Sequence, residues 1–533
     1  MSRILKLQKY LKENNINYFI INRTDEFLGE YIAPYAERLK WITGFSGSAG
    51  RAIISQERVH LFVDGRYTFQ AKEQINCDEI SLKHIDTYWD FLKELSKLRI
   101  NLTIDNKLHS IIEVNKIKNI FKNTNSKIHF SNKNPIDKLW KDQPKYPKSK
   151  IYNHPIKYSG ISREKKINKF QSILKYNKID YYILSSLDSI AWLLNIRGND
   201  IEHTPLAFAN LLIPDEGKLI LFCSIKNFKK DLMQEIISLC DLKLFQEIEE
   251  VFKNIPTGKS ISMDYYNTSI YFKNLSENFG LETSHFDNPC IYEKAIKNQV
   301  ELKGAKKANI RDGVSMVKFL YWIKNLKKID EISEIKAADY LYNIRKKNKL
   351  FHSLSFDTIS AVGKHAALPH YRVSQNTNIK LEKGNIYLVD SGAQYKDGTT
   401  DITRTIILGK PSKEKKDRFT RVLKGHIALA THVFSKGTRG ADIDHLARQS
   451  LRQVGCDYDH GTGHGIGSFL SVHEGPQRIA KKTDTNSSKL LPGMIISNEP
   501  GYYEKNKYGI RIENLIVVKK DMQNLLKFET ISF

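Results

Sequence analysis

Apolar residues in the first half of the chain occur in the same order twice. Each copy has an apolar stripe at i, i+3 and i+7, which predicts an amphipathic helix, followed by a β-type run and a tryptophan. The matching positions are Ile4, Leu7, Leu11, 18–21 and Trp41 in the first copy, and Ile167, Phe170, Leu174, 181–184 and Trp192 in the second. This repeat predicts two homologous α/β domains.

Proline-rich segments lie between the two copies. Asn134-Pro135 and the segment 143–148 are typical of a linker, because proline interrupts both helix and strand. The second copy ends near Asn288-Pro-Cys290. We therefore place the first two domains at 1–148 and 149–292.

A third domain, at 293–533, begins with a long helical pattern. This pattern runs from Gln299 to Lys328, and one of its faces carries the apolar residues Val314, Val317, Leu320 and Tyr321. The residues that carry chemistry lie in this third domain.

Composition indicates a globular protein of the cytoplasm. The chain has 533 residues, of which 41% are hydrophobic and 27% charged, and no apolar run approaches the length needed to span a bilayer. The segment Met1–Tyr10 lacks the apolar core of a signal peptide. The five cysteines of the whole chain are scattered and form no CxxC pair, which favours a reducing compartment.

The net charge of +25, from 84 basic and 59 acidic residues, raises the question of nucleic acid. The lysines are spread along the whole length, and the densest clusters, 345–349 and 413–418, are short. We interpret them as solvated faces and expect neither a nucleic-acid nor a membrane partner.

Two aspartates lie on a predicted hairpin. An apolar run ends at Asp390, and a second strand, 402–407, follows Asp401. A two-residue turn at Asp397-Gly398 would keep the two carboxylates about 13 Å apart at 3.3 Å per residue. We therefore expect a wider loop, with its tip near Tyr395-Lys396, so that both carboxylates reach one site.

Further candidate ligands follow. The run His460-Gly-Thr-Gly-His464-Gly-Ile-Gly467 has glycine at every second position, so it is not helical and lets the backbone pass close to a site. Glu499 ends a predicted strand. Arg511 and Glu513 alternate along another strand and are expected to share a face.

These residues together indicate a metal centre. Four ionised carboxylates can share one pocket only if cations neutralise them. A set of oxygen ligands with one imidazole suits two divalent ions, above all Mn²⁺, with Co²⁺ or Zn²⁺ as alternatives. The expected ligands are Asp390, Asp401, His464, Glu499 and Glu513.

The same segments carry a resemblance to a known family. The last part of the chain resembles the pita-bread metallopeptidases, and the whole chain is similar to the long, three-domain Xaa-Pro aminopeptidases. The matching motifs are 390–395, 401–405, 460–467, 472–476, 497–503 and 509–514 in the third domain, with 31–34, 44–50 and 64–67 in the first. Family members of this type usually continue beyond Phe533.

The resemblance implies a fold and an activity. The fold would be α/β, with two creatinase-like N-terminal α/β domains followed by a pita-bread catalytic domain of the α+β type. The activity would be that of a dinuclear, metal-dependent aminopeptidase. Such an enzyme hydrolyses the N-terminal Xaa-Pro bond of peptides by attack of a metal-bridging hydroxide, and the family suggests a homodimer.

The resemblance also implies roles for single residues. Asp390 and Asp401 would hold one metal, Asp401 and Glu513 would bridge, and His464 and Glu499 would complete the second site, with Glu499 as general base. Further catalytic or substrate-binding positions follow from the matched motifs: His370 at the scissile peptide, His473 at the oxyanion, His460 at the proline pocket, and Arg511 and Arg66 at the substrate.

Arg66 also differs from its counterpart in the repeat. The strand 61–63 runs into Asp64-Gly-Arg-Tyr67, whereas the second copy has Ser224-Ile-Lys-Asn227. This difference suggests a local function, because the planar guanidinium suits a peptide carbonyl or carboxylate. The alternative is a surface ion pair with Asp64, which would contribute little energy.

Three alternative functions are compared with this one. Creatinase needs no metal and is disfavoured by the complete ligand set. Prolidase cleaves dipeptides, but it lacks the duplicated N-terminal domain. A binding protein on a dead peptidase scaffold would have lost ligands, and this chain keeps all five.

Overall fold

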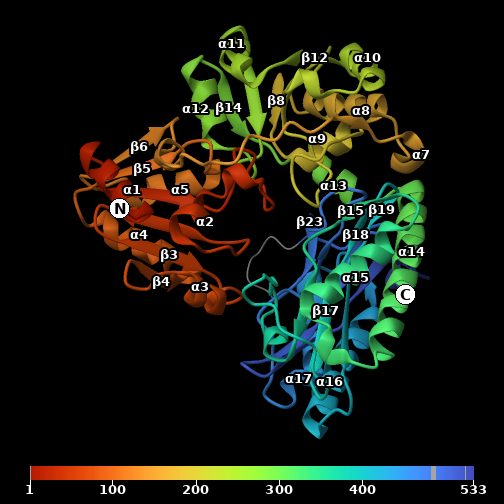
Figure 1. The fold of residues 1–533 in the computed structure, drawn as a ribbon. Helices are drawn as coiled ribbons and strands as arrows, with labels where there is room; N and C mark the ends of the chain where they lie inside the picture. Colours follow the sequence, from red (N-terminus) through yellow and green to blue (C-terminus); the bar gives the residue numbers. More distant parts are fainter. Residues whose placement is uncertain (1, 482–487, 523, 533) are drawn as a thin grey trace. The chain divides into compact units, whose positions relative to one another are not determined.

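The computed structural model describes residues 2–481, 488–522 and 524–532. The chain forms two compact units (Figure 1), described separately below. The first unit contains Met1–Asn153, Arg163–Glu202 and Leu206–Pro289. The second contains His154–Ser162, His203–Pro205 and Cys290–Phe533.

The first unit contains two six-stranded sheets with the same strand order. The first sheet runs β4 (Ile80–His84), β3 (Val59–Val63), β2 (Arg51–Ser55), β1 (Tyr18–Asn22), β5 (Asn101–Asp105), β6 (Lys127–Ser131). The second runs β12 (Cys240–Lys243), β11 (Leu219–Cys223), β10 (Ala209–Pro214), β8 (Tyr181–Leu184), β13 (Ser260–Met263), β14 (Glu282–His285). The predicted pair of homologous α/β domains is confirmed.

Helices cover both sheets of this unit. In the first domain these are α1 (Arg3–Glu13), α2 (Arg38–Thr43), α3 (Thr68–Gln74), α4 (Tyr88–Ser96) and α5 (Ile111–Phe121). In the second they are α8 (Arg163–Tyr176), α9 (Leu187–Leu193), α10 (Lys230–Leu239), α11 (Ile248–Lys253) and α12 (Ile270–Asn278). The two predicted apolar stripes are the buried faces of α1 and α8.

The two domains are also joined by backbone hydrogen bonds. The amide of Ile111 donates to the carbonyl of Thr268, and the amide of Ile270 donates to that of His109. An antiparallel bridge pairs Ser110 with Ser269 between them. The start of α5 is thereby tied to the start of α12.

Part of the predicted linker is helical. Asn134 is the N-cap of the short helix α6 (Pro135–Leu139), and its side-chain oxygen accepts a hydrogen bond from the amide of Ile136. Proline at the first helical position needs no hydrogen-bond partner, so here it begins a helix rather than breaking one. Residues 143–148 have no regular structure, as expected. The proposed domain limits at 148/149 and 292/293 stay predictions.

The second unit combines five main helices with several small sheets. The helices are α13 (Cys290–Ala295), α14 (Gln299–Lys324), α15 (Glu334–Lys346), α16 (Lys413–Ala430) and α17 (Gly440–Arg452). One sheet is β15 (Phe351–Leu354), β18 (Ala393–Tyr395), β19 (Gly398–Thr399), and another is β16 (Ile359–Val362), β17 (Ile386–Ser391), β20 (Ile402–Ile407). The largest is β21 (Val433–Ser435), β28 (Leu525–Thr530), β27 (Asn514–Lys520), β24 (Ile495–Asn498), β22 (Gly463–Gly465), β23 (Glu474–Ile479), and β25 (Gly501–Glu504) pairs with β26 (Tyr508–Arg511).

The buried face of α14 is not the one that the apolar pattern indicated. Val317 and Tyr321 are 61% and 72% exposed, whereas Met316 and Phe319 are buried. The buried face also carries Asp312, which a search for apolar periodicity passes over. The helix itself was predicted correctly, but its orientation was not.

A buried ion pair explains both this face and one of the basic clusters. Arg345, interpreted above as part of a solvated cluster, is fully buried on α15 and donates two hydrogen bonds to Asp312, at 2.8 and 2.7 Å. Tyr395 donates to the same carboxylate, and Arg345 also donates to the carbonyl of Ser391. The pair therefore fixes the hairpin that carries the candidate aspartates.

Removing one partner of this pair tests its contribution. We expect Asp312→Ala to lower the free energy of unfolding by about 3–5 kcal/mol, because it leaves the Arg345 guanidinium buried without a counter-charge. Urea unfolding followed by fluorescence measures the change. As a control, Glu331→Ala removes the exposed partner of Lys328 and should shift the stability by less than about 1 kcal/mol. Equal effects in the two variants would contradict the assigned role.

Candidate metal centre

The hairpin after β17 differs from the predicted loop. Its turn is Lys396-Asp397, and Asp390 lies opposite Thr403, not opposite Asp401. The predicted tip at Tyr395-Lys396 is therefore wrong by one residue. The carboxylates still meet, because residues offset by two positions on paired strands share a face of the sheet.

Gly392 is the point where this hairpin changes from one sheet to the next. A Cβ atom at Gly392 would lie 1.9 Å from the carbonyl oxygen of Thr400, so only glycine fits there. The predicted wider loop would bring the two carboxylates together by its length. The protein instead uses a two-residue turn and a close backbone contact at Gly392.

The glycine-rich run around His464 packs tightly against neighbouring strands. A Cβ at Gly463 would lie 1.9 Å from the carbonyl oxygen of Ser497, and one at Gly465 would lie 2.1 Å from that of Glu474. The strand β22 can therefore run between β24 and β23 with His464 at its centre. The sequence-based expectation of close backbone approach is confirmed here.

Glu499 and Glu513 follow strand ends. Glu499 comes directly after β24, and its Oε1 accepts a hydrogen bond from Ser497 at 3.1 Å. Glu513 lies in the break between β26 and β27, so the continuous strand expected at 509–513 is interrupted after Arg511. Thr403 of β20 donates to Glu513 at 2.7 Å and holds it toward the hairpin.

The structure brings these side chains to one site. Donor atoms of Asp401, His464 and Glu513 all lie within 4.8 Å of one another. The Nε2 atom of His464 is 3.5 Å from an oxygen of Asp401 and 3.5 Å from one of Glu499. Asp390 lies close enough for its charge to act on the others.

Asp390 is oriented by Arg511. The guanidinium donates to Oδ2 of Asp390 at 2.6 Å and to the hydroxyl of Tyr503 at 2.8 Å, and it is buried. The other oxygen of Asp390, Oδ1, is buried and has no hydrogen-bond partner among the described residues. Arg511 thus holds the Asp390 side chain through Oδ2 and leaves Oδ1 of Asp390 available to a metal ion.

Burial and the crowding of carboxylates raise the pKa values of the site. Burial, followed by the charges of Asp401, Asp390 and Glu499, raises the pKa of Glu513 well above its usual range. Burial and the nearby carboxylates also raise the pKa of Asp390 to about 6, although Arg511 opposes this. Burial alone would lower the pKa of His464, but Asp401 and Glu499 outweigh it and raise the value to about 9.

These features fit divalent metal ions. Four carboxylates and one imidazole lie near one another, and Oδ1 of Asp390 is buried without a hydrogen-bond partner among the described residues. Oxygen-rich sets with an imidazole are the ligands of Mn²⁺ and related ions, whose positive charge would offset the carboxylates.

The three candidate histidines lie in different surroundings. His473 packs edge-to-face on His464, with ring centres 4.3 Å apart. His460 shares a 2.8 Å hydrogen bond with the hydroxyl of Tyr503, which also binds Arg511. His370 lies partly buried in the loop that follows β16. His473 thus contacts a candidate ligand directly, and His460 is connected to Asp390 through Tyr503 and Arg511.

The loop that carries His370 is held by Glu334, a residue that the sequence reasoning missed. The buried carboxylate of Glu334 accepts hydrogen bonds from the amide of Val362 at 2.8 Å and from the hydroxyl of Tyr371 at 3.1 Å. It also contacts Nδ1 of His365 at 2.9 Å, and the His365 and Tyr371 rings stack. Helical periodicity gave no signal, because Glu334 is simply the first residue of α15.

Arg66 lies in the first unit, after β3. Its guanidinium donates to both oxygens of Asp64, at 2.9 and 2.7 Å, and it is partly exposed. The surface ion pair considered above is therefore present. The pairing holds the guanidinium in a fixed direction.

Comparison with known proteins agrees with this architecture. Residues 303–520 match metallopeptidase family M24, and residues 3–133 and 142–301 each match the creatinase/prolidase N-terminal domain. A probable Xaa-Pro aminopeptidase P from Talaromyces marneffei is 38% identical over 97% of this chain and 81% of its own length. The chain belongs to the Xaa-Pro aminopeptidase P family of M24 metallopeptidases.

Solved structures extend the comparison. An X-prolyl aminopeptidase from Caenorhabditis elegans, described as a cytosolic enzyme with a di-nuclear active site, is 30% identical, with a TM-score of 0.93 over 100% of this chain and 91% of that one. A prolidase from Pyrococcus furiosus is 21% identical, with a TM-score of 0.55, and shares the fold over 68% of this chain and 99% of its own. The predicted fold class, two N-terminal α/β domains before an M24 domain, is confirmed.

Metal binding should depend on pH. We expect the affinity of metal-stripped protein for Mn²⁺ to rise at least tenfold per pH unit from pH 6 to 8. His464, with a pKa of about 9, must release a proton to bind, and the raised pKa of Glu513 adds to the effect. Calorimetric titrations in buffers of different ionisation enthalpy measure both the affinity and the released protons. An affinity that does not change over this range would contradict the assignment of His464 as a ligand.

Proposed function

We propose that this chain is an aminopeptidase that removes the N-terminal residue of peptides with proline at position 2, using two divalent metal ions. The observation that carries the proposal is the convergence of Asp401, His464 and Glu513, with donor atoms within 4.8 Å. The names of relatives that share 36–38% of their residues over almost the whole chain support the substrate class.

The ligand positions can be assigned within this proposal. Asp390 and Asp401 would hold one ion, His464 and Glu499 the other, and Asp401 and Glu513 would bridge them. When bound, the two ions supply an activated water and stabilise negative charge on the reacting carbonyl. Mn²⁺ is the proposed metal, and Co²⁺ or Zn²⁺ are the alternatives.

The remaining steps belong to side chains of this chain. Glu499 would accept a proton from the attacking water as general base. Its carboxylate lies at the ligand cluster, 3.5 Å from His464. His473 would donate to the oxyanion, and His370 would contact the scissile peptide. His460 would line the proline pocket. Arg511 would act by orienting Asp390, which its 2.6 Å hydrogen bond favours over direct contact with substrate.

Substrate length separates this function from that of prolidase. The prolidase structure matches 68% of this chain over nearly its own full length, so this chain contains an additional segment that the prolidase lacks. The duplicated N-terminal domain accounts for that additional length. We expect Arg-Pro-Pro to be cleaved after its first residue, and an Xaa-Pro dipeptide to be cleaved more slowly. Assays with and without Mn²⁺ test the point. Cleavage confined to dipeptides would favour prolidase, and no metal-dependent cleavage of either would favour a non-catalytic role.

Location and assembly are also part of the proposal. We place the enzyme in the cytoplasm, since the Caenorhabditis elegans relative is described as cytosolic. The resemblance to the family suggests a homodimer. Among the described residues, no helix combines the length and apolar character that crossing a membrane requires. Sedimentation equilibrium of the full chain tests the dimer.

The metal ligands can be tested by one substitution. We expect Asp401→Asn to abolish turnover of Arg-Pro-Pro and to reduce the bound metal below two ions per chain, because it removes a shared negative ligand. Elemental analysis of the purified protein gives the stoichiometry. Asp417→Asn, on the outer part of α16, is the matched control. Full activity of the Asp401 variant would refute the dinuclear mechanism.

His473 should act on the chemical step. We expect His473→Ala to lower kcat by about 10²–10³-fold, as the loss of one oxyanion donor does elsewhere, with unchanged metal content. His445→Ala, on an exposed part of α17, should leave kcat at the wild-type level. If kcat of the His473 variant is also unchanged, His473 does not contact the oxyanion.

Arg66 should act on substrate length. We expect Arg66→Ala to raise KM for tripeptides and longer peptides, while kcat and the metal content stay near wild type, because the guanidinium would bind a peptide carbonyl or carboxylate. Lys226→Ala changes the counterpart in the second copy of the repeat and should leave KM unchanged. A wild-type KM for the Arg66 variant at all lengths would leave only the pair with Asp64.

A further inference from the structure

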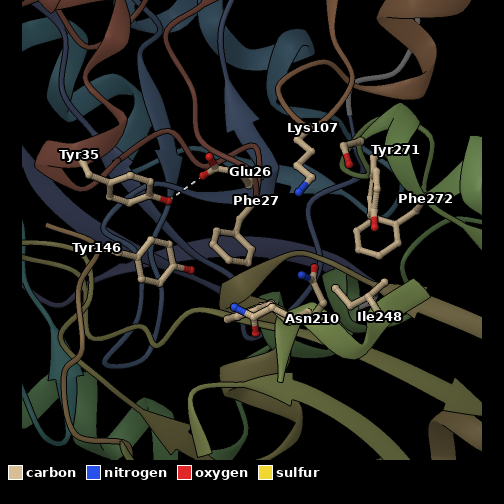
Figure 2. A pocket seen from close by; sticks show the side chains of 12 residues that line it. Glu26, Phe27, Tyr35, Lys107, Tyr146, Asn210, Ile248, Tyr271 and Phe272 are labelled. Atoms are coloured by element: carbon tan, nitrogen blue, oxygen red, sulfur yellow. Dashed lines mark hydrogen bonds between the residues drawn. The ribbon is translucent and has the colours of Figure 1, made fainter. Parts of the chain in front are cut away.

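The first unit contains a cavity of about 470 Å³ between its two α/β domains, within the size range of small-molecule sites. Figure 2 shows its side chains, with Phe27, Tyr35 and Tyr146 on one side and Tyr271 and Phe272 on the other. The cavity plays no part in the proposed peptidase chemistry.

The topology explains why side chains meet here. In the first domain, β1 and β5 are parallel neighbours, so the segments after both strands leave at the same sheet edge; Glu26 follows β1 and Lys107 follows β5. In the second domain, β8 and β13 are also parallel, and Tyr271 follows β13. The carboxyl ends of parallel strands are where open α/β sheets bind ligands.

One end of the cavity carries an excess of negative charge. Glu26 accepts hydrogen bonds from Tyr35 at 2.6 Å and Arg38 at 2.8 Å, but the same guanidinium is shared with Asp137. Burial would raise the pKa of Glu26, yet Arg38 and Tyr35 hold it below its usual value, so the carboxylate is ionised. One cation thus serves two carboxylates.

Lys107 supplies the opposite charge. Its ammonium lies over the Tyr271 ring, 5.1 Å from the ring centre, and it has no carboxylate within ion-pair distance among the described residues. In Figure 2 the amine extends into the space between the two groups of aromatic rings. The backbone on either side is held, since the amide of Tyr271 donates to the carbonyl of Asn106.

A buried polar group without a partner also lines the cavity. Asn210, on β10, is 5% exposed, and its Oδ1 atom has no hydrogen-bond partner in the described part of the chain. Burying such an acceptor without a partner is unfavourable, and an apolar residue of the same size would avoid this cost. The position is therefore better suited to a ligand than to packing.

We propose that this cavity binds a small zwitterion of the α-amino acid type, either a free amino acid or a dipeptide. Its ammonium would lie toward Glu26, its carboxylate toward Lys107, and its apolar part between the aromatic rings, with Asn210 accepting a hydrogen bond from it. The cavity shares no lining residue with the candidate metal centre, and binding there does not depend on turnover.

Calorimetric titration of the full, metal-loaded chain with leucyl-phenylalanine, which has no proline, tests the proposal. We expect saturable binding, and at least a tenfold rise in Kd for Lys107→Ala and for the N-acetylated, C-amidated dipeptide. Lys83→Ala, which removes a lysine over another aromatic ring, should not change Kd. Binding should persist in Asp401→Asn. Binding that is lost in that variant would assign the dipeptide to the metal centre and overturn the proposal.

Asn210→Leu provides a second test that does not rely on the charges. We expect this variant to keep or raise the thermal unfolding midpoint and to lose dipeptide binding, because leucine fills the space and needs no partner. A variant that is clearly destabilised would show that Asn210 is structural. Wild-type affinity in both Lys107→Ala and Asn210→Leu would likewise refute the site.

Discussion

The catalytic unit is organised around the repulsion between carboxylates that are buried together. Asp390, Asp401, Glu499 and Glu513 would move apart in water, and burial makes their proximity more unfavourable still. The protein holds them by contacts on the side away from the centre, such as Arg511 on Asp390 and Thr403 on Glu513. Folding thus produces a site with uncompensated negative charge, which bound divalent ions would neutralise.

Backbone packing makes this convergence possible. The hairpin contributes Asp390 and Asp401, and three further segments contribute His464, Glu499 and Glu513. The backbone around these segments is packed so closely that a Cβ atom would collide at Gly392, Gly463 and Gly465. The glycines therefore serve the site indirectly. They allow neighbouring strands of one sheet, and the two arms of the hairpin, to lie at contact distance.

Residue type and order were sufficient to predict the repeat and the proximity of Asp401, His464 and Glu513, because the first depends on local periodicity and the second on ligand chemistry. Features that depend on long-range packing were not predictable in this way. The hairpin changes sheet at Gly392, where it packs against Thr400, and the buried face of α14 follows from the pairing of Asp312 with Arg345 on α15. Likewise, Asn134-Pro135 begins a helix only because Asn134 caps it.

The loop after β16 has little regular structure beyond one short 3₁₀ turn, yet its amides, a ring nitrogen and a hydroxyl all converge on the single carboxylate of Glu334. The same loop also packs Ala366 and Tyr371 against Leu388, so it is fixed to both α15 and β17. Loss of the Glu334 carboxylate would nevertheless break the contacts with Val362, His365 and Tyr371 at the same time. Because His370 directly precedes Tyr371, the order of the backbone around this candidate catalytic residue depends in part on a side chain of α15.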